Sequence, residues 1–446
     1  MVGIGEADVA HALFQHGKDR LLAALRRRMQ RQRSVRRPHD PHHLPALQAF
    51  APSAAAHADH HPTARQRPQL LGPAVAPFLL PFAGQPFGQT RDPALWSAQH
   101  LFRYLGPASA PGKDKSMTFR MPAEWAPHDW TWIGFPTNPD EWPGAFDGAR
   151  RQIANFASAL HADGKGEEVR LVVANEADAD AARALVAPGV TIAVHRLGDV
   201  WLRDTAPIAV LNGVTGERAL VDFGFNGWGG KYQMPGDEDI GARLAATTGM
   251  ATSTQNWVFE GGAIDTDGTG LFVTTEQCLL NPNRNPDLDR GKIETLLAGA
   301  LGLSDMLWLG DGLLNDHTDG HVDNLARFVA PGKLALPIAT TPDDPNTAIY
   351  ADARARAKAH GVEVVDIPSP GLVLVDGEAI PASYMNFYVG NAAVIVPIYG
   401  QPNDQAALDA FAPFFPGRQI IGLRSDAILS GGGSFHCCSQ QMPSLV

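Results

Sequence analysis

The sequence predicts an α/β fold built from repeated strand–turn–strand units and preceded by an extension without a stable fold. The first observation behind this expectation is a change of composition near Met117, where a segment rich in Ala, Pro, His and Arg gives way to apolar strands separated by turn residues. The second is the recurrence of paired strands at a loose period, with helical segments between them. We therefore divide the chain into residues 1–116 and residues 117–446.

Residues 1–116 have the composition of a disordered extension. They contain nine of the sixteen histidines and stretches such as RQRSVRRPHDPHHLP, whose proline density prevents long helices. Residues 21–29 could form one short basic helix, and in a functional interpretation the arginines of residues 26–37 would bind an anionic surface or nucleic acid. We favour a disordered or non-native extension upstream of a start at Met117, and we expect its removal to leave activity and stability nearly unchanged.

Four strand–turn–strand units carry the repeat. Their turns lie near Asn212, Gly268, Gly332 and Gly390, at separations of 56, 64 and 58 residues. Repeats of roughly this length indicate radially arranged units whose loops converge at one end, where chemistry is usually placed. The sequence also predicts helices at residues 177–185 and 347–360 and buried strands at residues 168–175 and 363–368.

The composition of the whole chain suits a globular enzyme. It has 446 residues, of which 44% are apolar, which is enough to bury a sizeable core. Its three cysteines, Cys278, Cys437 and Cys438, cannot form a full disulfide framework and suit a reducing compartment, so we expect a cytoplasmic protein. No run of 18 uncharged apolar residues and no clear signal peptide occur in the sequence, which speaks against membrane insertion and secretion.

Charge is divided unevenly along the chain. Residues 1–116 contain 15 Lys and Arg against 7 Asp and Glu, whereas residues 117–446 contain 21 against 40. A strongly acidic body attracts cations and repels nucleic acid. We therefore expect a small cationic substrate as the partner, and neither nucleic acid nor a membrane. A homo-oligomer is compatible with the sequence, which does not determine the oligomeric state.

Four short segments place reactive side chains where strands give way to turns: WLRDTAP, FEGG, DHTDGHVDN and SGGGSFHCCSQQ. A cysteine and a histidine from distant segments, backed by carboxylates, form a candidate nucleophile–base pair, because a thiolate attacks far better than a thiol and needs a base or a cation beside it. The three glycines before the first cysteine let the backbone approach a ligand closely. The candidate residues are Asp204, Glu260, His321, Asp323 and Cys437.

These segments resemble those of the agmatine deiminase family, which is related to the Porphyromonas-type peptidyl-arginine deiminases in the guanidino-group-modifying (pentein) superfamily. The resemblance runs from about Met117 to Pro443 and includes MPAEWAPHDWTWIGFP, RDTAP, NGWGG, FEGGAIDTDG, TDGHVDNLARFV and GGGSFHC in the family's order. It implies a five-bladed α/β propeller of ββαβ units, no metal and no cofactor. It also implies hydrolysis of a guanidinium to a ureido group plus ammonia, with agmatine converted to N-carbamoylputrescine.

The resemblance also implies a role for each candidate residue. Cys437 would attack the guanidinium carbon and form a covalent amidino-cysteine (thiouronium) intermediate, while His321 would act as general acid and then as general base. Asp204 and Asp323 would hold the planar N–H groups of the guanidinium, a geometry that carboxylates match well. Glu260 would accept the other N–H of His321 and so fix its tautomer.

One tryptophan is selected as a substrate contact from four candidates. A cation–π contact would suit a guanidinium or an amine, although a tryptophan belongs more often to a core than to a pocket. We select Trp201 because it lies three positions before Asp204. The candidates are Trp125, Trp142, Trp201 and Trp228.

Each catalytic assignment has a purely structural alternative. Asp204 could cap backbone amides in an ordinary turn, Glu260 could be a simple loop residue, and Cys437 could be a small buried apolar side chain. We interpret Cys278 and Cys438 in this last way, because alternation along an extended segment turns Cys438 away from the face of its neighbour.

Other functions stay open on the sequence. An amidinotransferase on the same fold would pass the amidino group to an amine, and a guanidine-binding protein would lack turnover. A departure from the family pattern GGGNIHCITQQQP at residues 434–442 leaves peptidyl-arginine, free arginine or another guanidine as alternative substrates. A zinc-dependent amidohydrolase could use the nitrogen and oxygen ligands of DHTDGHVDN. Those ligands are His317, Asp319, His321 and Asp323.

Overall fold

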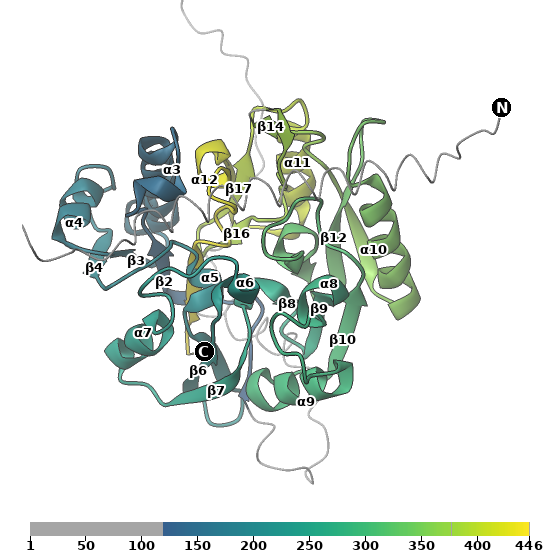
Figure 1. Cartoon of the computed structure of the whole chain (residues 1–446), viewed down its shortest axis with the longest axis horizontal. Helices are drawn as coiled ribbons and strands as arrows, with labels where there is room; N and C mark the ends of the chain where they lie inside the picture. The colour runs from purple at the N-terminus through teal and green to yellow at the C-terminus, as the bar shows by residue number, and fades with distance from the viewer. Residues whose placement is uncertain (1–118, 376, 446) are drawn as a thin grey trace, which may run out of the picture. The chain divides into compact units, whose positions relative to one another are not determined.

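The structure, a computed structural model, describes residues 119–375 and 377–445 (Figure 1). The extension expected at residues 1–116 and the domain boundary at Met117 lie outside the described residues, so both stay predictions. In the described part of the chain, no helix is long and apolar enough to cross a membrane.

Five sheets of three or four strands contain most of the described strands, and a two-stranded hairpin forms a sixth. The strands are β1 Phe119–Arg120, β2 His128–Gly134, β3 Glu168–Val173, β4 Thr191–Val194, β5 Ile208–Asn212, β6 Arg218–Gly224, β7 Thr252–Val258, β8 Ile264–Thr266, β9 Leu271–Thr275, β10 Asp305–Leu309, β11 Arg327–Ala330, β12 Lys333–Ile338, β13 Glu363–Pro368, β14 Leu374–Val375, β15 Glu378–Ala379, β16 Tyr388–Val389, β17 Ala393–Ile398, β18 Gln419–Arg424 and β19 Ser439–Pro443. The sheet orders are β1-β5-β6-β7, β10-β9-β8, β11-β12-β13, β16-β17-β18, β19-β2-β3-β4 and β14-β15.

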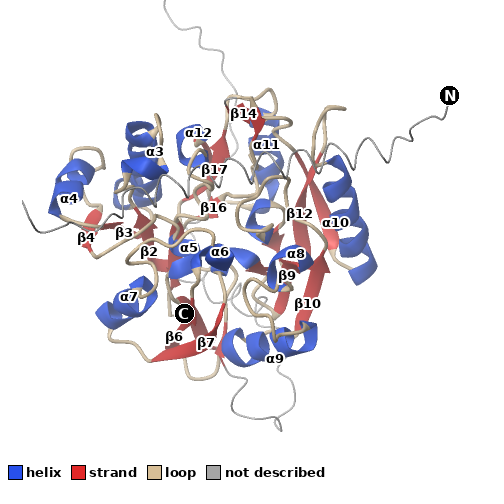
Figure 2. Cartoon of the chain, viewed as in Figure 1, coloured by secondary structure: helices blue, strands red, loops and turns tan. Residues whose placement is uncertain are grey.

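The five larger sheets share one pattern, in which an antiparallel pair is followed by a parallel neighbour. The pairs β5–β6, β8–β9, β11–β12, β16–β17 and β19–β2 are antiparallel, and the next strand in each sheet runs parallel. A parallel neighbour needs a crossover of about a dozen residues or more, usually a helix. Each sheet is therefore a ββαβ unit, and Figure 2 shows the longer helices outside the strands.

Local sequence explains where these helices begin and end. In α9 the side chain of Asp289 accepts a hydrogen bond from the Lys292 amide at the N-terminus, and the left-handed Gly302 ends the helix. In α3 the buried face includes Ile153, Phe156 and Leu160 at helical spacing. The α-helices are α3 Phe146–His161, α4 Glu176–Arg183, α5 Leu202–Thr205, α6 Gly227–Gly230, α7 Ile240–Thr248, α8 Glu276–Leu279, α9 Arg290–Leu301, α10 Thr347–His360, α11 Asp404–Phe411 and α12 Asp426–Leu429, with 3-10 turns η2 Pro139–Glu141, η3 Ala162–Gly164, η4 Gly261–Ala263, η5 Val322–Asn324 and η6 Ala412–Phe414.

The four predicted hairpins are confirmed as β5–β6, β8–β9, β11–β12 and β16–β17. The predicted helices are α4 and α10, and the predicted strand at residues 168–175 is the largely buried β3. The strand predicted at residues 363–368 is present, but the prediction that it is buried is wrong. This strand, β13, has Ile367 as its buried residue, because it lies at the edge of its sheet and pairs with β12 alone.

The fifth unit joins the two ends of the described chain. Strand β19 pairs antiparallel with β2, so that Gln440 lies opposite Trp132. This pairing was not predicted, since nothing local in either strand reports a partner some 300 residues away. It has a consequence for the site, because Cys437 lies two residues before β19 and is carried by this sheet.

Candidate active site

The five residues singled out in the sequence converge in the structure. The sulfur of Cys437 lies 3.6 Å from Asp323 Oδ2, and the two nitrogens of His321 lie 3.6 Å from Asp204 Oδ1 and 3.1 Å from Glu260 Oε2. All five side chains are buried. They come from separate elements: Asp204 from α5, Glu260 from the residue before η4, His321 and Asp323 from the start of η5, and Cys437 from the segment before β19.

Gly262 shows where these groups face one another. A Cβ atom placed on Gly262 would lie 2.6 Å from His321 Nδ1, 2.9 Å from Asp204 Oδ1 and 3.1 Å from Asp323 Oδ2. Any side chain at this position would fill the space that the three polar groups border, so the site requires glycine here. Among the described residues, His321 Nδ1 and Asp323 Oδ1 are buried polar atoms without a hydrogen-bond partner. Buried polar atoms are usually hydrogen-bonded, so each of these two atoms can form a further hydrogen bond.

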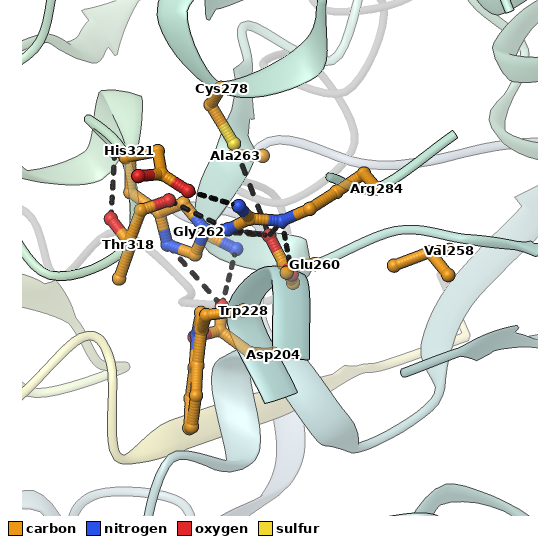
Figure 3. Close-up of polar contacts among 12 residues, drawn as sticks. Asp204, Trp228, Val258, Glu260, Gly262, Ala263, Cys278, Arg284, Thr318 and His321 are labelled. Carbon is orange, nitrogen blue, oxygen red and sulfur yellow. Dashed lines mark hydrogen bonds and ion pairs between the residues drawn. The ribbon is translucent and has the colours of Figure 1, made fainter. Parts of the chain in front are cut away.

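Glu260 holds His321 from the side away from this space (Figure 3). The carboxylate also accepts three hydrogen bonds from Arg284, at 2.9, 3.2 and 3.0 Å. Burial opposes ionisation of Glu260, but His321 and Arg284 together hold its pKa below the ordinary value. Arg284 also pairs with Asp319, which fixes it to the segment that carries His321. Arg284 was not predicted, since an arginine in a turn gives no sign of its distant partner.

The charges around His321 favour its protonated form. Burial lowers the pKa of this imidazole, but Asp204 and Glu260 raise it, and the net result lies well above the ordinary value. For Asp204, in contrast, the surroundings favour the neutral form. Burial and the negative charges of Glu260 and Asp323 raise its pKa to about 6, although His321 and a hydrogen bond from Trp228 oppose the shift. In the absence of a bound cation, Asp204 is therefore the least compensated carboxylate of the site.

Asn386 fixes the nucleophile candidate. Its side-chain amide donates to the sulfur of Cys437 at 3.0 Å, and its carbonyl oxygen accepts from the backbone amides of His436 and Cys437 at 3.1 and 3.2 Å. Burial and the charges of Asp323 and Asp204 hold the pKa of Cys437 well above its ordinary value, so the thiol is protonated in this state. Asn386 was also missed, because asparagine in a loop is usually a turn residue.

The other two cysteines occupy different environments. The thiol of Cys438 is buried and points to the carbonyl oxygen of Phe435 at 3.4 Å, so it does not share the surroundings of Cys437. Cys278 is also buried, but it lies closer to the site than expected, with its sulfur 3.9 Å from Glu260. Burial raises the pKa of both thiols.

Aromatic side chains border the glycine loop before Cys437. A Cβ atom on Gly433 would lie 2.6 Å from Trp201, and one on Gly431 would lie 2.5 Å from Trp142. The two indoles contact each other with centroids 5.8 Å apart. Trp228, which was not selected, donates to Asp204 at 3.0 Å. The remaining candidate, Trp125, packs against two hydrophobic clusters of the core.

The ligands proposed for a zinc site are not brought together. Asp319 pairs with Lys231 and Arg284, and Asp323 with His436. Within the described ranges, the group of side chains close enough to hold a metal ion is Glu260, Cys278 and His321. The guanidinium of Arg284 already occupies Glu260 and would repel a dication there. The residues of DHTDGHVDN that could have bound zinc therefore do not form a common metal site.

Comparisons with known proteins agree with this geometry. The family model for Porphyromonas-type peptidyl-arginine deiminase matches residues 120–443. The agmatine deiminases of Stutzerimonas stutzeri and Pseudomonas fluorescens are each 36% identical over 356 residues, covering 73% of this chain and 96% of theirs. The solved structure of the Enterococcus faecalis agmatine deiminase is 31% identical, with a TM-score of 0.69, and the match covers 76% of this chain and 100% of that one.

The family-model match extends over nearly the whole described region, including every segment that contributes to the site. The resemblance noted in the sequence is thereby confirmed, and the mixed α/β fold is shared with these relatives. The chain belongs to the agmatine deiminase family and is a hydrolase that acts on the C–N bonds of guanidino groups.

Proposed function

We propose that the protein hydrolyses agmatine to N-carbamoylputrescine and ammonia, with Cys437 as the nucleophile. The observation that carries this proposal is the pair of buried atoms without a hydrogen-bond partner, His321 Nδ1 and Asp323 Oδ1, within the described site. They belong to the groups that surround the space beside Gly262, close to the sulfur of Cys437. A planar cation with several N–H donors complements the carboxylate oxygens of Asp204 and Asp323 that border this space.

The first step is binding of the guanidinium between two carboxylates. Asp204 and Asp323 come from different elements and both border the space beside Gly262. Each would accept N–H donors of the cation, and rigid holding places the central carbon next to a soft nucleophile. Binding also changes the nucleophile, because the negative charges of Asp323 and Asp204 help to raise the pKa of Cys437. A cation between these carboxylates offsets their charge and lowers that pKa.

The second step is covalent chemistry with His321 as proton carrier. With the cation bound, the Cys437 thiol loses its proton to solvent, and the thiolate forms a C–S bond with the guanidinium carbon. His321 gives its proton to the departing nitrogen, and the C–N bond breaks to release ammonia. Water then attacks the thiouronium carbon and passes one proton to His321; the C–S bond breaks, the second water proton returns to the Cys437 sulfur, and the ureido product leaves. Glu260 supports the imidazolium from the other ring nitrogen at 3.1 Å.

Agmatine is favoured by two independent features. Relatives 36% identical to this chain are agmatine deiminases. The acidic excess of residues 117–446 also suits a dication. The indole of Trp201 lies against the glycine loop that precedes Cys437 and stays the proposed cation–π contact of the substrate.

The proposed scaffold is a five-bladed α/β propeller. Five sheets repeat the ββαβ pattern, and the β19–β2 pair builds one of them from both ends of the described chain. Such an arrangement would explain why loops from all parts of the described chain meet at one site.

A panel of guanidines tests the function. Purified full-length protein is incubated with agmatine, arginine, a peptidyl-arginine and guanidinobutane, and both ammonia and the ureido product are measured. We expect agmatine to give the highest kcat/KM and equal amounts of the two products. A Cys437→Ala protein serves as control. Preference for another guanidine would reject agmatine as the substrate. Transfer of the amidino group to an added amine, without release of ammonia, would indicate an amidinotransferase. No turnover of any guanidine would reject the function itself.

A further inference from the structure

His436, the neighbour of Cys437, is a buried histidine that was not among the predicted site residues. Its ring is 2% exposed in the structure and lies between two carboxylates. Nδ1 is 2.7 Å from Asp323 Oδ2, and Nε2 is 2.9 Å from Glu124 Oε2. Both nitrogens of this imidazole therefore face acceptor atoms.

This arrangement fixes the orientation of the His436 ring. An ionised carboxylate accepts hydrogen bonds and cannot donate them, so Nδ1 is the donor to Asp323 Oδ2. His436 thus has a partner at each ring nitrogen, whereas Nδ1 of His321 has no hydrogen-bond partner among the described residues.

Glu124 holds the ring of His436 at Nε2, on the side opposite Asp323. It contacts Arg203 at 3.3 Å and Arg327 at 3.0 Å, and it accepts a hydrogen bond from the Val389 amide at 2.8 Å. Burial opposes ionisation of Glu124, but Arg327, His436 and Arg203 keep its pKa well below the ordinary value. The carboxylate is thus charged and fixed in place.

The same contact acts on Asp323 from the other side. Burial would raise the pKa of Asp323, yet the hydrogen bond and charge of His436, with His321 and Arg327, hold it below the ordinary value. Because Oδ2 is engaged by His436, Oδ1 is the oxygen left without a partner.

We propose that His436 is a positioning residue, held between Glu124 and Asp323, whose Nδ1 engages Asp323 Oδ2 and orients this carboxylate so that Oδ1 is available to the guanidinium. The proposal rests on the proposed function in one respect, namely that Asp323 binds the substrate. It predicts that loss of this hydrogen bond weakens substrate binding through Asp323 and through no other route.

The backbone around His436 is held independently of its ring. Its amide donates to Asn386 at 3.1 Å, and its carbonyl accepts from Arg203 Nε at 3.3 Å. A His436→Gln substitution therefore leaves the anchors of the loop in place while removing the ring Nδ1 that donates to Asp323.

A binding cycle tests the proposal in the Cys437→Ala protein, where turnover does not interfere. Agmatine Kd is measured by calorimetry with His436→Gln, with Asp323→Asn and with both. We expect His436→Gln alone to weaken binding about tenfold or more, and to add less than about twofold when Asp323 is already Asn. Equal weakening in both backgrounds would overturn the proposal. His128→Gln is a matched control, because His128 is a buried histidine beside the carboxylate of Glu167 and should leave Kd within about twofold.

The hydrogen bond from His436 to Asp323 is measured separately in the wild-type full chain by nitrogen NMR of labelled histidines, with His436→Gln for assignment by absence. We expect Nδ1 of His436 to carry the proton that is hydrogen-bonded to Asp323. A His436 Nδ1 without a proton would overturn the proposal even if the variants misfold. The two failures are distinguishable: a Cys437→Ala protein that binds no guanidine rejects the proposed function, while the NMR signal reports His436 regardless.

Discussion

Two buried groups of carboxylates in this protein respond to burial in opposite ways. Asp199 accepts hydrogen bonds from the Val200 amide and the Trp201 side chain, and Asp237 accepts hydrogen bonds from the Gly198 and Asp199 amides. Burial and their mutual repulsion raise the pKa of Asp199 to about 8, and burial raises that of Asp237 to about 7, with Arg243 offsetting a part of the second shift.

In the active site, Glu260 and Asp323 are as deeply buried, but cationic partners hold their pKa values below the ordinary range. Asp204 lies between the two cases, with a pKa raised to about 6. Burial thus sets the direction of the shift unless a cation reverses it. Asp204 therefore lacks a full counter-charge. A bound guanidinium would supply this charge.

The largest effect is expected for the reacting groups. Cys437→Ala or His321→Ala should reduce ammonia release by about 10³-fold or more while the fold survives, because each removes an atom that forms or carries a bond or proton. Steady-state assays together with circular dichroism measure this. Cys438→Ala is the matched control and should keep most activity, since its thiol points to Phe435. An equal loss in the two cysteine variants would show that the nucleophile was wrongly assigned.

The next effect concerns the carboxylates that are proposed to grip the cation. Asp204→Asn and Asp323→Asn keep the shape but remove a charge-assisted contact worth about 1.5–3 kcal/mol, so affinity should fall roughly 10- to 150-fold. In the wild type a guanidine analogue should speed alkylation of Cys437, and in these variants it should not. Glu260→Gln should weaken turnover while binding stays closer to normal. The opposite ranking of affinities would exchange the proposed roles.

The pH dependence of kcat/KM tests whether the pKa of Asp204 lies between those of the two groups of carboxylates. Its carboxyl must lose a proton to accept the guanidinium, and its pKa in the free enzyme is about 6. Below that pH, kcat/KM should fall by about tenfold per unit as the neutral form accumulates. A profile of kcat/KM from acidic to neutral pH measures this limb. A flat profile across that range would show that Asp204 is already fully ionised in the free enzyme.

The smallest effect tests the uncompensated pair. Since the folded-state pKa of Asp199 is raised to about 8, its protonated form favours folding; this contribution is complete below the unfolded value near 3.8 and is lost as pH rises through about 8. Asp199→Asn keeps an oxygen for the Val200 amide, gives up the second oxygen that serves Trp201, and cannot ionise. We expect it to be more stable than the wild type by about 1 kcal/mol near pH 8, with the difference shrinking near pH 5. Urea unfolding at both pH values measures it, and a less stable variant at pH 8 would contradict the pKa shift.

The sequence by itself determined the local structure and the reactive residues. Hairpins such as β5–β6 and helix α10 follow from apolar periodicity and turn residues that lie within a few positions of one another. The segments that carry Asp204, His321 and Cys437 stand out because each joins a reactive side chain to a strand end or a glycine turn. Their catalytic roles stay predictions, as does the disorder of residues 1–116.

Only the tertiary structure decided which groups support these residues. Arg284 meets Glu260 across 24 positions, Asn386 meets Cys437 across 51, and His436 meets Asp323 across 113. The physical reason is that hydrogen bonds and ion pairs depend on distance in space, while periodicity and turn chemistry describe neighbours along the chain. The β19–β2 pair, formed by strands from opposite ends of the described chain, brings the Cys437 segment to the site through the same kind of long-range contact.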